Sequence, residues 1–181
     1  LILDLIKRTD GKFRVAYSIS GVALDQFAKY TPEVLDSFKE LAQTGAVEFL
    51  SETYYHSLAF LYSKDEFKEQ VMKHKEKIQS LFGQTPKVFR NTELIYNNEL
   101  ANYVEQMGYK GIIAEGADHI LGWRSPNFLY RPKTTRNMAL LLKNYKLSDD
   151  IAFRFSNRSW SEWPLSAEKF ADWVSSNNGN G

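Results

Sequence analysis

The sequence predicts an α/β domain in which helices cover a parallel sheet. Short apolar runs alternate with longer segments whose apolar residues recur at helical spacing, and the turns between them are short. Crossovers of this kind build either a β/α barrel or an open doubly wound sheet, and periodicity alone does not separate the two. In both architectures, functional sites gather at the carboxyl ends of the strands.

Five short runs are predicted as strands because they are apolar or rich in aromatic and β-branched residues. They cover residues 13–18, 46–50, 88–90, 111–114 and 138–142. A long irregular stretch, residues 115–137, separates the last two. The order of the runs along the chain, with helical segments between them, favours parallel pairing.

Helices are predicted where cap and stop residues bracket a helical period. They run from Thr31 to Gly45, from Ser63 to Gly83, from Asn98 to Gly108 and from Ser166 to Val174. The second is long and charged, and its apolar face includes His74. The lysines around His74 alternate with glutamates, which is typical of a solvated helix face, so a structural or surface role is expected for this histidine.

Composition excludes several classes of protein. The 181 residues are 43% hydrophobic and 25% charged, which is near the globular average. A formal net charge of +1 gives no electrostatic footprint for nucleic acid, and no run of 18 apolar residues suggests a membrane span. Without any cysteine, disulfides, thiolate metal sites and cysteine nucleophiles are ruled out.

The two ends of the sequence suggest a piece of a larger protein. The chain opens on Leu1 without an initiator methionine and closes on a polar tail of Ser, Asn and Gly. No basic region precedes an apolar core at the start, so no signal peptide is visible and a cytoplasmic location is expected.

Acidic residues follow four consecutive predicted strands. The groups are Glu48 and Glu52 with His56; Glu93 with Arg90; Glu115 and Asp118 with His119; and Asp149 with Asp150. Tyrosines and tryptophans lie among them. Paired carboxylates suit glycosidic bond cleavage, and aromatic rings suit stacking on sugars. A single acid after a strand is more often a helix cap, and a single aromatic residue more often packs in the core, so the pattern alone predicts only a glycan-active α/β domain.

Other chemistries find no support in the motifs. Neither a glycine-rich nucleotide loop nor a nucleophile elbow is present. The histidines at positions 56, 74 and 119 include no close pair at metal-ligand spacing. No metal and no organic cofactor is expected.

The segment Val88-Phe89-Arg90-Asn91-Thr92-Glu93-Leu94-Ile95-Tyr96 resembles the nucleophile region of glycoside hydrolase family 57, in its α-amylase branch. Three further segments agree with the family in order and spacing. They are residues 45–56, which look like the second signature region, residues 111–123, and residues 147–155, which look like the fourth region. The resemblance covers nearly the whole chain.

The resemblance implies that residues 1–181 form part of a catalytic domain, an incomplete or distorted (β/α)7 barrel. The family's first region, a His-Gln-Pro motif on the first strand, is absent, as is the fifth region in the helical segment after the barrel. Turnover of a glucan by the chain alone therefore stays open.

By resemblance, Glu93 matches the nucleophile and Asp150 the acid/base of a retaining mechanism that cleaves α-1,4-glucosidic bonds. The neighbouring Asp149 is the next candidate for the acid/base, and would point elsewhere if the strand continued. The expected substrate is an α-glucan or malto-oligosaccharide.

The residues expected to bind substrate are less specific. Glu48 and His56 match positions at the substrate end of the family's barrel. Arg90 could help to keep Glu93 ionised, and Trp123 could form a sugar platform or pack in the core. Trp163 with Pro164 resembles a Trp-Pro pair that follows the acid/base in related glucanotransferases.

Three alternatives stay open. Within the family, glucan transfer, branching or α-galactosidase activity competes with hydrolysis, because water or a sugar hydroxyl can attack the intermediate. The chain could also be a non-catalytic glycan-binding or scaffold domain. A metal-dependent deacetylase on a similar barrel would need clustered His and Asp ligands that this sequence does not offer.

Overall fold

The strands run parallel and follow the order of the chain. The computed structural model describes residues 1–177. Its strands are β1 (Val15–Tyr17), β2 (Val47–Phe49), β3 (Val88–Arg90), β4 (Gly111–Glu115) and β5 (Ala139–Lys143). Each of them falls within or overlaps a run that the sequence predicts as a strand.

Two sheets, β1-β2 and β3-β4-β5, are joined by a single bridge between Ser51 and Phe89. The Ser51 amide donates to the Val88 carbonyl at 2.9 Å, and the Arg90 amide donates to the Ser51 carbonyl at 2.8 Å. The spatial order is therefore β1-β2-β3-β4-β5. A doubly wound sheet reverses its strand order at a switch point, and these five strands do not. The arrangement is an open arc of a β/α barrel.

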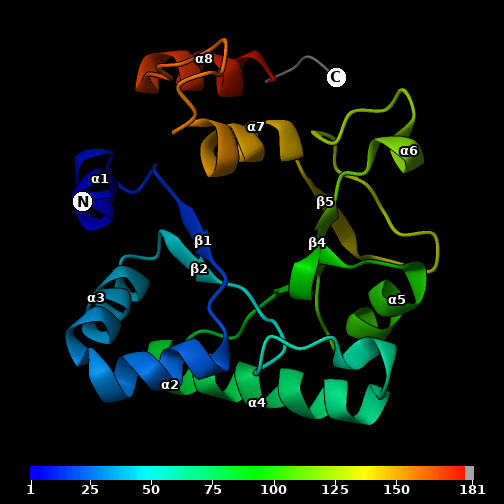
Figure 1. Ribbon diagram of the computed structural model, residues 1–181. Helices are drawn as coiled ribbons and strands as arrows, with labels where there is room; N and C mark the ends of the chain where they lie inside the picture. The colour runs from blue at the N-terminus through cyan, green and yellow to red at the C-terminus, as the bar shows by residue number, and fades with distance from the viewer. Residues whose placement is uncertain (178–181) are drawn as a thin grey trace.

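Helices occupy the connections between the strands and the segment after β5. They are α1 (Ile2–Arg8), α2 (Gly21–Tyr30), α3 (Pro32–Gln43), α4 (Lys64–Phe82), α5 (Asn98–Gln106), α6 (Asp118–Leu121), α7 (Tyr145–Asp149) and α8 (Ala167–Ser176). Short 3-10 turns, η1 (Ala59–Leu61) and η2 (Thr92–Leu94), and a π-helix, η3 (Asp150–Arg154), complete the list. Figure 1 shows α2 to α5 around the strands, and α7 and α8 at the opposite edge of the molecule.

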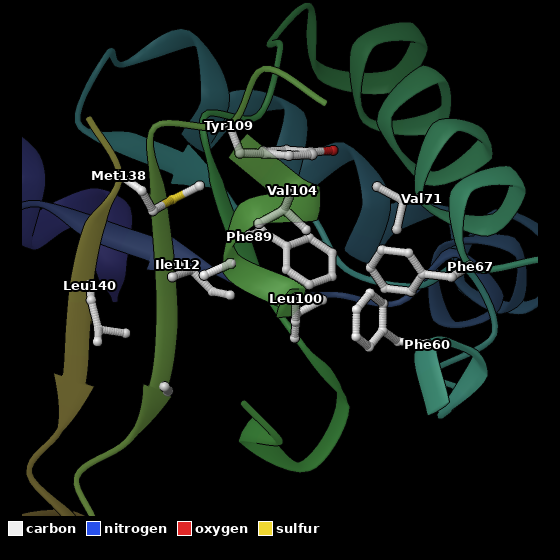
Figure 2. Packing of buried hydrophobic residues seen from close by; sticks show 12 residues of the cluster. Phe60, Phe67, Val71, Phe89, Leu100, Val104, Tyr109, Ile112, Met138 and Leu140 are labelled. Atoms are coloured by element: carbon white, nitrogen blue, oxygen red, sulfur yellow. The ribbon is translucent and has the colours of Figure 1, made fainter. Parts of the chain in front are cut away.

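The core forms where α4 packs against the strands. Phe67 of α4 lies 5.5 Å from Phe89 of β3, ring centre to ring centre, in an edge-on contact (Figure 2). A second cluster centres on Phe49 of β2, which stacks on Phe82 at 4.0 Å. Offset and edge-on ring contacts add to the stabilisation from buried apolar area. The end of α4 and both sheets are thereby fixed to each other.

Side chains alternate between the two faces of the strands. In β2, Val47 and Phe49 are buried against the helices, whereas Glu48 between them is exposed on the opposite face. In β3, Phe89 is buried and Arg90 is half-buried. Glu48 and Arg90 therefore lie on the face of the strands opposite to the one that packs against the helices.

Helices α1, α2, α6 and α7 lie in segments for which no helix was predicted. Helix α2 was not expected; Ser20 caps it by accepting from the Ala23 amide at 3.2 Å. The segment with Asp149 and Asp150 is helical, not extended, because Asn144 caps α7 by accepting from the Leu147 amide at 3.1 Å. Within residues 1–177, no helix is both long and apolar enough to cross a bilayer.

Candidate active site

Glu93 sits in a strained turn directly after β3. Its backbone and that of Leu94 are left-handed, with φ of 55° at both residues. Such a conformation costs about 1–3 kcal/mol per non-glycine residue and persists only where the surroundings impose it. Here the buried Asn91 braces the turn, because its Nδ2 donates to the Ile95 carbonyl at 3.0 Å. The turn leaves the Glu93 side chain 74% exposed.

His56 faces Glu93 from the loop after β2. Its Nε2 lies 3.7 Å from Oε1 of Glu93, and its Nδ1 lies 3.2 Å from Oε1 of Glu52. The His56 backbone is also left-handed, with φ of 53°. Two strained residues from different strand ends thus meet at one point, which is typical of functional sites.

A cavity of about 740 Å³ opens beside Glu93. Two strand ends supply its acidic residues, because Glu93 follows β3 and Glu115 ends β4. His119 of α6 also lines it. Its wall is mainly apolar, and Arg124, Arg131 and Lys133 add positive charge. Acids that follow two consecutive strands, Glu93 and Glu115, thus line the same cavity.

Asp150 does not line the cavity beside Glu93. It is buried in η3, where Oδ1 accepts from Arg154 at 2.5 Å. It lines a separate hollow of about 370 Å³ with Trp160 and Trp173. The structure does not bring Glu93 and Asp150 to one cavity, and Asp149 lies on the same helical segment as Asp150, not on a continuing strand.

The other expected binding residues are dispersed. Glu48 lies within β2, not after it, and lines a small hollow with Arg14 and Ala16. Arg90 ends β3, two residues before the Glu93 turn begins. Trp123 is 94% exposed, and Trp163 is 43% exposed with the Arg158 guanidinium 6.0 Å from its ring centre. Among the residues expected to bind substrate, His56 is the one whose ion-pair contact with Glu93 is seen in the described residues.

His74 has a structural role, as expected. It is fully buried; its Nε2 donates to the Ile19 carbonyl at 2.8 Å, and its Nδ1 faces the Glu52 amide at 3.5 Å. A carbonyl only accepts and an amide only donates, so these contacts select the neutral ring with its proton on Nε2. Burial lowers the pKa of His74, in agreement with this form. Within residues 1–177, no three His, Asp or Glu side chains gather as a metal site would require.

Sequence reasoning placed Glu52 near a strand end but gave it no role. The structure shows that Glu52 holds His56, and that Ser18 donates to its other oxygen. The four-residue spacing of Glu52 and His56 was the available signal. Ser18 comes from the end of β1, and no local pattern connects it to Glu52.

Comparison with known proteins identifies the family. The profile of glycosyl hydrolase family 57 matches residues 1–180, almost the entire chain. The chain belongs to glycosyl hydrolase family 57. The resemblance of the Glu93 segment to this family is thereby confirmed.

Relatives within family 57 are longer than this chain. A Methanocaldococcus jannaschii protein, provisionally named an alpha-amylase, is 50% identical over 180 residues, which are 99% of this chain and 38% of that protein. The chain thus spans well under half of that relative.

Solved structures support the fold. The 4-alpha-glucanotransferase of Thermococcus litoralis matches 99% of this chain and 27% of its own, with a TM-score of 0.78 at 17% identity. The family 57 branching enzyme of Pyrococcus horikoshii matches 80% of this chain and 40% of its own, with a TM-score of 0.64 at 15% identity. These likenesses confirm an incomplete barrel.

Proposed function

We propose that this family 57 chain carries the nucleophile of a retaining glycoside hydrolase that cleaves α-1,4-glucosidic bonds. The observation that carries the proposal is the position of Glu93. It occupies the nucleophile's place in the family motif, its carboxylate is exposed at a cavity, and a strained turn after β3 presents it. Catalytic groups at the carboxyl ends of parallel strands are the rule for barrel enzymes.

In this mechanism the Glu93 carboxylate attacks the anomeric carbon of the sugar. A bond forms between its oxygen and that carbon while the glycosidic C–O bond breaks, and an acid protonates the leaving oxygen. Water then attacks the glycosyl ester, giving its proton to the same acid/base group, and the sugar leaves with its original anomeric configuration.

The acid/base role of Asp150 rests on the sequence motif. A retaining pair has its carboxyl groups about 5–5.5 Å apart. Asp150 is engaged by Arg154 and lines a different hollow from Glu93, so the geometry adds no support to this assignment. We keep it as the motif's candidate for direct testing.

The proposed substrate is an α-glucan or malto-oligosaccharide. At the cavity, the carboxylates of Glu93 and Glu115 can accept hydrogen bonds from sugar hydroxyls, and His119 can accept or donate one. The apolar wall suits the C–H faces of the rings. The name of the M. jannaschii relative agrees with this substrate class.

Anomer-resolved NMR of the full-length protein with a malto-oligosaccharide tests the proposal. Retaining hydrolysis gives the α-anomer first, followed by slow mutarotation. Initial release of the β-anomer would exclude a glycosyl-enzyme at Glu93. Longer oligosaccharides in place of free reducing ends would indicate glucan transfer by the same nucleophile.

A further inference from the structure

Glu52 is a buried carboxylate beside the loop that carries His56. Glu52 is 2% exposed, although it belongs to the loop after β2, in which Tyr55 lies at the surface. A buried carboxylate is strongly unfavourable unless hydrogen bonds compensate its lost hydration. Ser18 donates to Oε2, and His56 Nδ1 lies 3.2 Å from Oε1. Both oxygens are therefore occupied, one by Ser18 from the end of β1 and the other by His56 from the same loop as Glu52.

The loop that carries His56 is itself tightly bonded. The His56 amide donates to the Thr53 carbonyl at 3.0 Å, and the Ser57 amide donates to Thr53 Oγ1 at 2.8 Å. These bonds fix the backbone, but the ring is still 43% exposed and free to rotate about its side-chain bonds unless something holds it. The contact with Glu52 supplies that hold, because a carboxylate only accepts and the bond therefore needs a proton on Nδ1. The Glu93 carboxylate also only accepts, so Nε2 can donate to it only when the ring carries both protons.

We propose that Glu52 is a positioning residue that acts on the nucleophile through His56. By holding Nδ1, it directs Nε2 of the same ring toward Oε1 of Glu93, 3.7 Å away. The chain of contacts runs Ser18–Glu52–His56–Glu93 and joins the ends of β1, β2 and β3. The inference rests on the proposed function, because it assumes that Glu93 is the nucleophile.

The arrangement has a clear consequence for catalysis. The nucleophile's carboxylate is mostly exposed, so few contacts fix its orientation before substrate arrives. A ring anchored by a buried group restricts the positions that Glu93 can take, and a misplaced nucleophile slows attack steeply. Loss of Glu52 should therefore lower kcat more than it raises KM.

A double-mutant cycle in the full-length protein tests this inference. Glu52→Gln, His56→Ala and the double variant are compared by kcat and KM on an aryl α-maltoside. Each single variant should lose about 10- to 100-fold in kcat, the range found where a carboxylate that orients a metal-bound histidine is removed. The double variant should lose no more than the worse single variant, because both act through one contact. If the two losses multiply, the inference is overturned.

Two further measurements separate positioning from folding. ¹⁵N NMR of the His56 ring should show a protonated Nδ1 in the wild type and a mixture of tautomers in Glu52→Gln. The matched control Glu76→Gln, on the exposed face of α4, should leave kcat and the His56 signals unchanged. A Glu52→Gln variant that only melts earlier, with unaltered kcat and ring signals, would also overturn the inference.

Failure of the proposed function gives a different result. If Glu93→Gln kept normal turnover, the nucleophile assignment would fall, whatever the His56 ring showed. If Glu93→Gln were inactive and Glu52 and His56 showed no coupling in kcat, the assignment of Glu93 would stand and the positioning role of Glu52 would be rejected.

Discussion

His56 Nε2 lies 3.7 Å from Oε1 of Glu93, although the two residues follow different strands. The parallel order of β2 and β3 places both loops at the same end of the arc. Both backbones are left-handed, a conformation that is uncommon for residues other than glycine. Such strain is common where a fold presents reacting groups, and here it coincides with the motif's nucleophile.

Replacing Glu93 by Gln should abolish turnover while binding persists. The amide keeps the shape and volume of the side chain but cannot attack the anomeric carbon, so kcat should fall by about 10³-fold or more. Dissociation constants for a malto-oligosaccharide, measured by calorimetry, should stay within a few-fold of the wild type. A variant with near-normal kcat would contradict the assignment.

Replacing Asp150 by Asn distinguishes a structural role of this residue from a catalytic one. The ion pair with Arg154 predicts a small loss of stability, about 1 kcal/mol, because the Arg154 side chain is 42% exposed to water. Arg154→Gln should cost a similar amount in urea unfolding.

If Asp150 is the acid/base, Asp150→Asn should also lose glucan activity, which Arg154→Gln should not. Glucan cleavage should vanish, whereas substrates with an aryl leaving group should still form the glycosyl-enzyme, and azide should restore its turnover. Full glucan activity in Asp150→Asn would remove Asp150 from the mechanism.

Stability should fall as the pH drops below about 6.5, the usual pKa of histidine. Burial lowers the pKa of His74, so the unfolded chain binds a proton that the folded chain refuses. The stability that neutral His74 contributes is fully present above the pKa of the unfolded state. It is lost as the pH falls toward the lower pKa of the folded state. The pKa of Asp25 is lowered too, first by the hydrogen bond from Lys77, but carboxylates titrate at more acidic pH.

Urea unfolding at pH 7.5 and 5.5 checks this dependence. The wild type should lose more free energy of unfolding between the two values than His74→Gln, which has no imidazole to protonate. Equal losses in both proteins would show that His74 does not govern the acid sensitivity.

Replacing Gly21 by Ala should destabilise the fold. Gly21 begins α2, and a Cβ there would press into the ring of Tyr54, closer than real Cβ contacts come. Tyr54 cannot easily move away, because it is buried and its hydroxyl donates to Asp25 at 2.6 Å. Overpacking of this kind costs about 1–3 kcal/mol.

Urea unfolding of Gly21→Ala, alone and with Tyr54→Leu, measures the clash. The methyl group should cost less in the Tyr54→Leu background, where the ring is gone. An unchanged midpoint for Gly21→Ala would show that the contact is not tight.

The sequence predicted the parallel strands well because each is a short apolar run between clear helix signals. Helix α3 begins at Pro32 and α4 ends before Gly83, where cap and stop residues predict these limits. Helix α7 was missed because no helix was predicted between residue 142 and Ser166, although Asn144 offered a cap. Local signals therefore predicted the five strands and helices α3, α4, α5 and α8, but not α1, α2, α6 or α7.

The site was predicted less completely. Glu93 and His56 could be named from the family motif, but their contact depends on left-handed turns that no local pattern predicts. The pairing of Ser18 with Glu52 joins distant parts of the chain. Asp150 was chosen by motif, and its ion pair with Arg154 became visible only in three dimensions.

Trapping the covalent intermediate tests the central claim most directly. A fluorinated α-glucosyl fluoride, which forms the glycosyl-enzyme faster than it is hydrolysed, is incubated with the full-length protein, and the digest is analysed by mass spectrometry. The account predicts one added glycosyl group on the peptide that contains Glu93, and none in Glu93→Gln. A glycosyl group on a different carboxylate would contradict it.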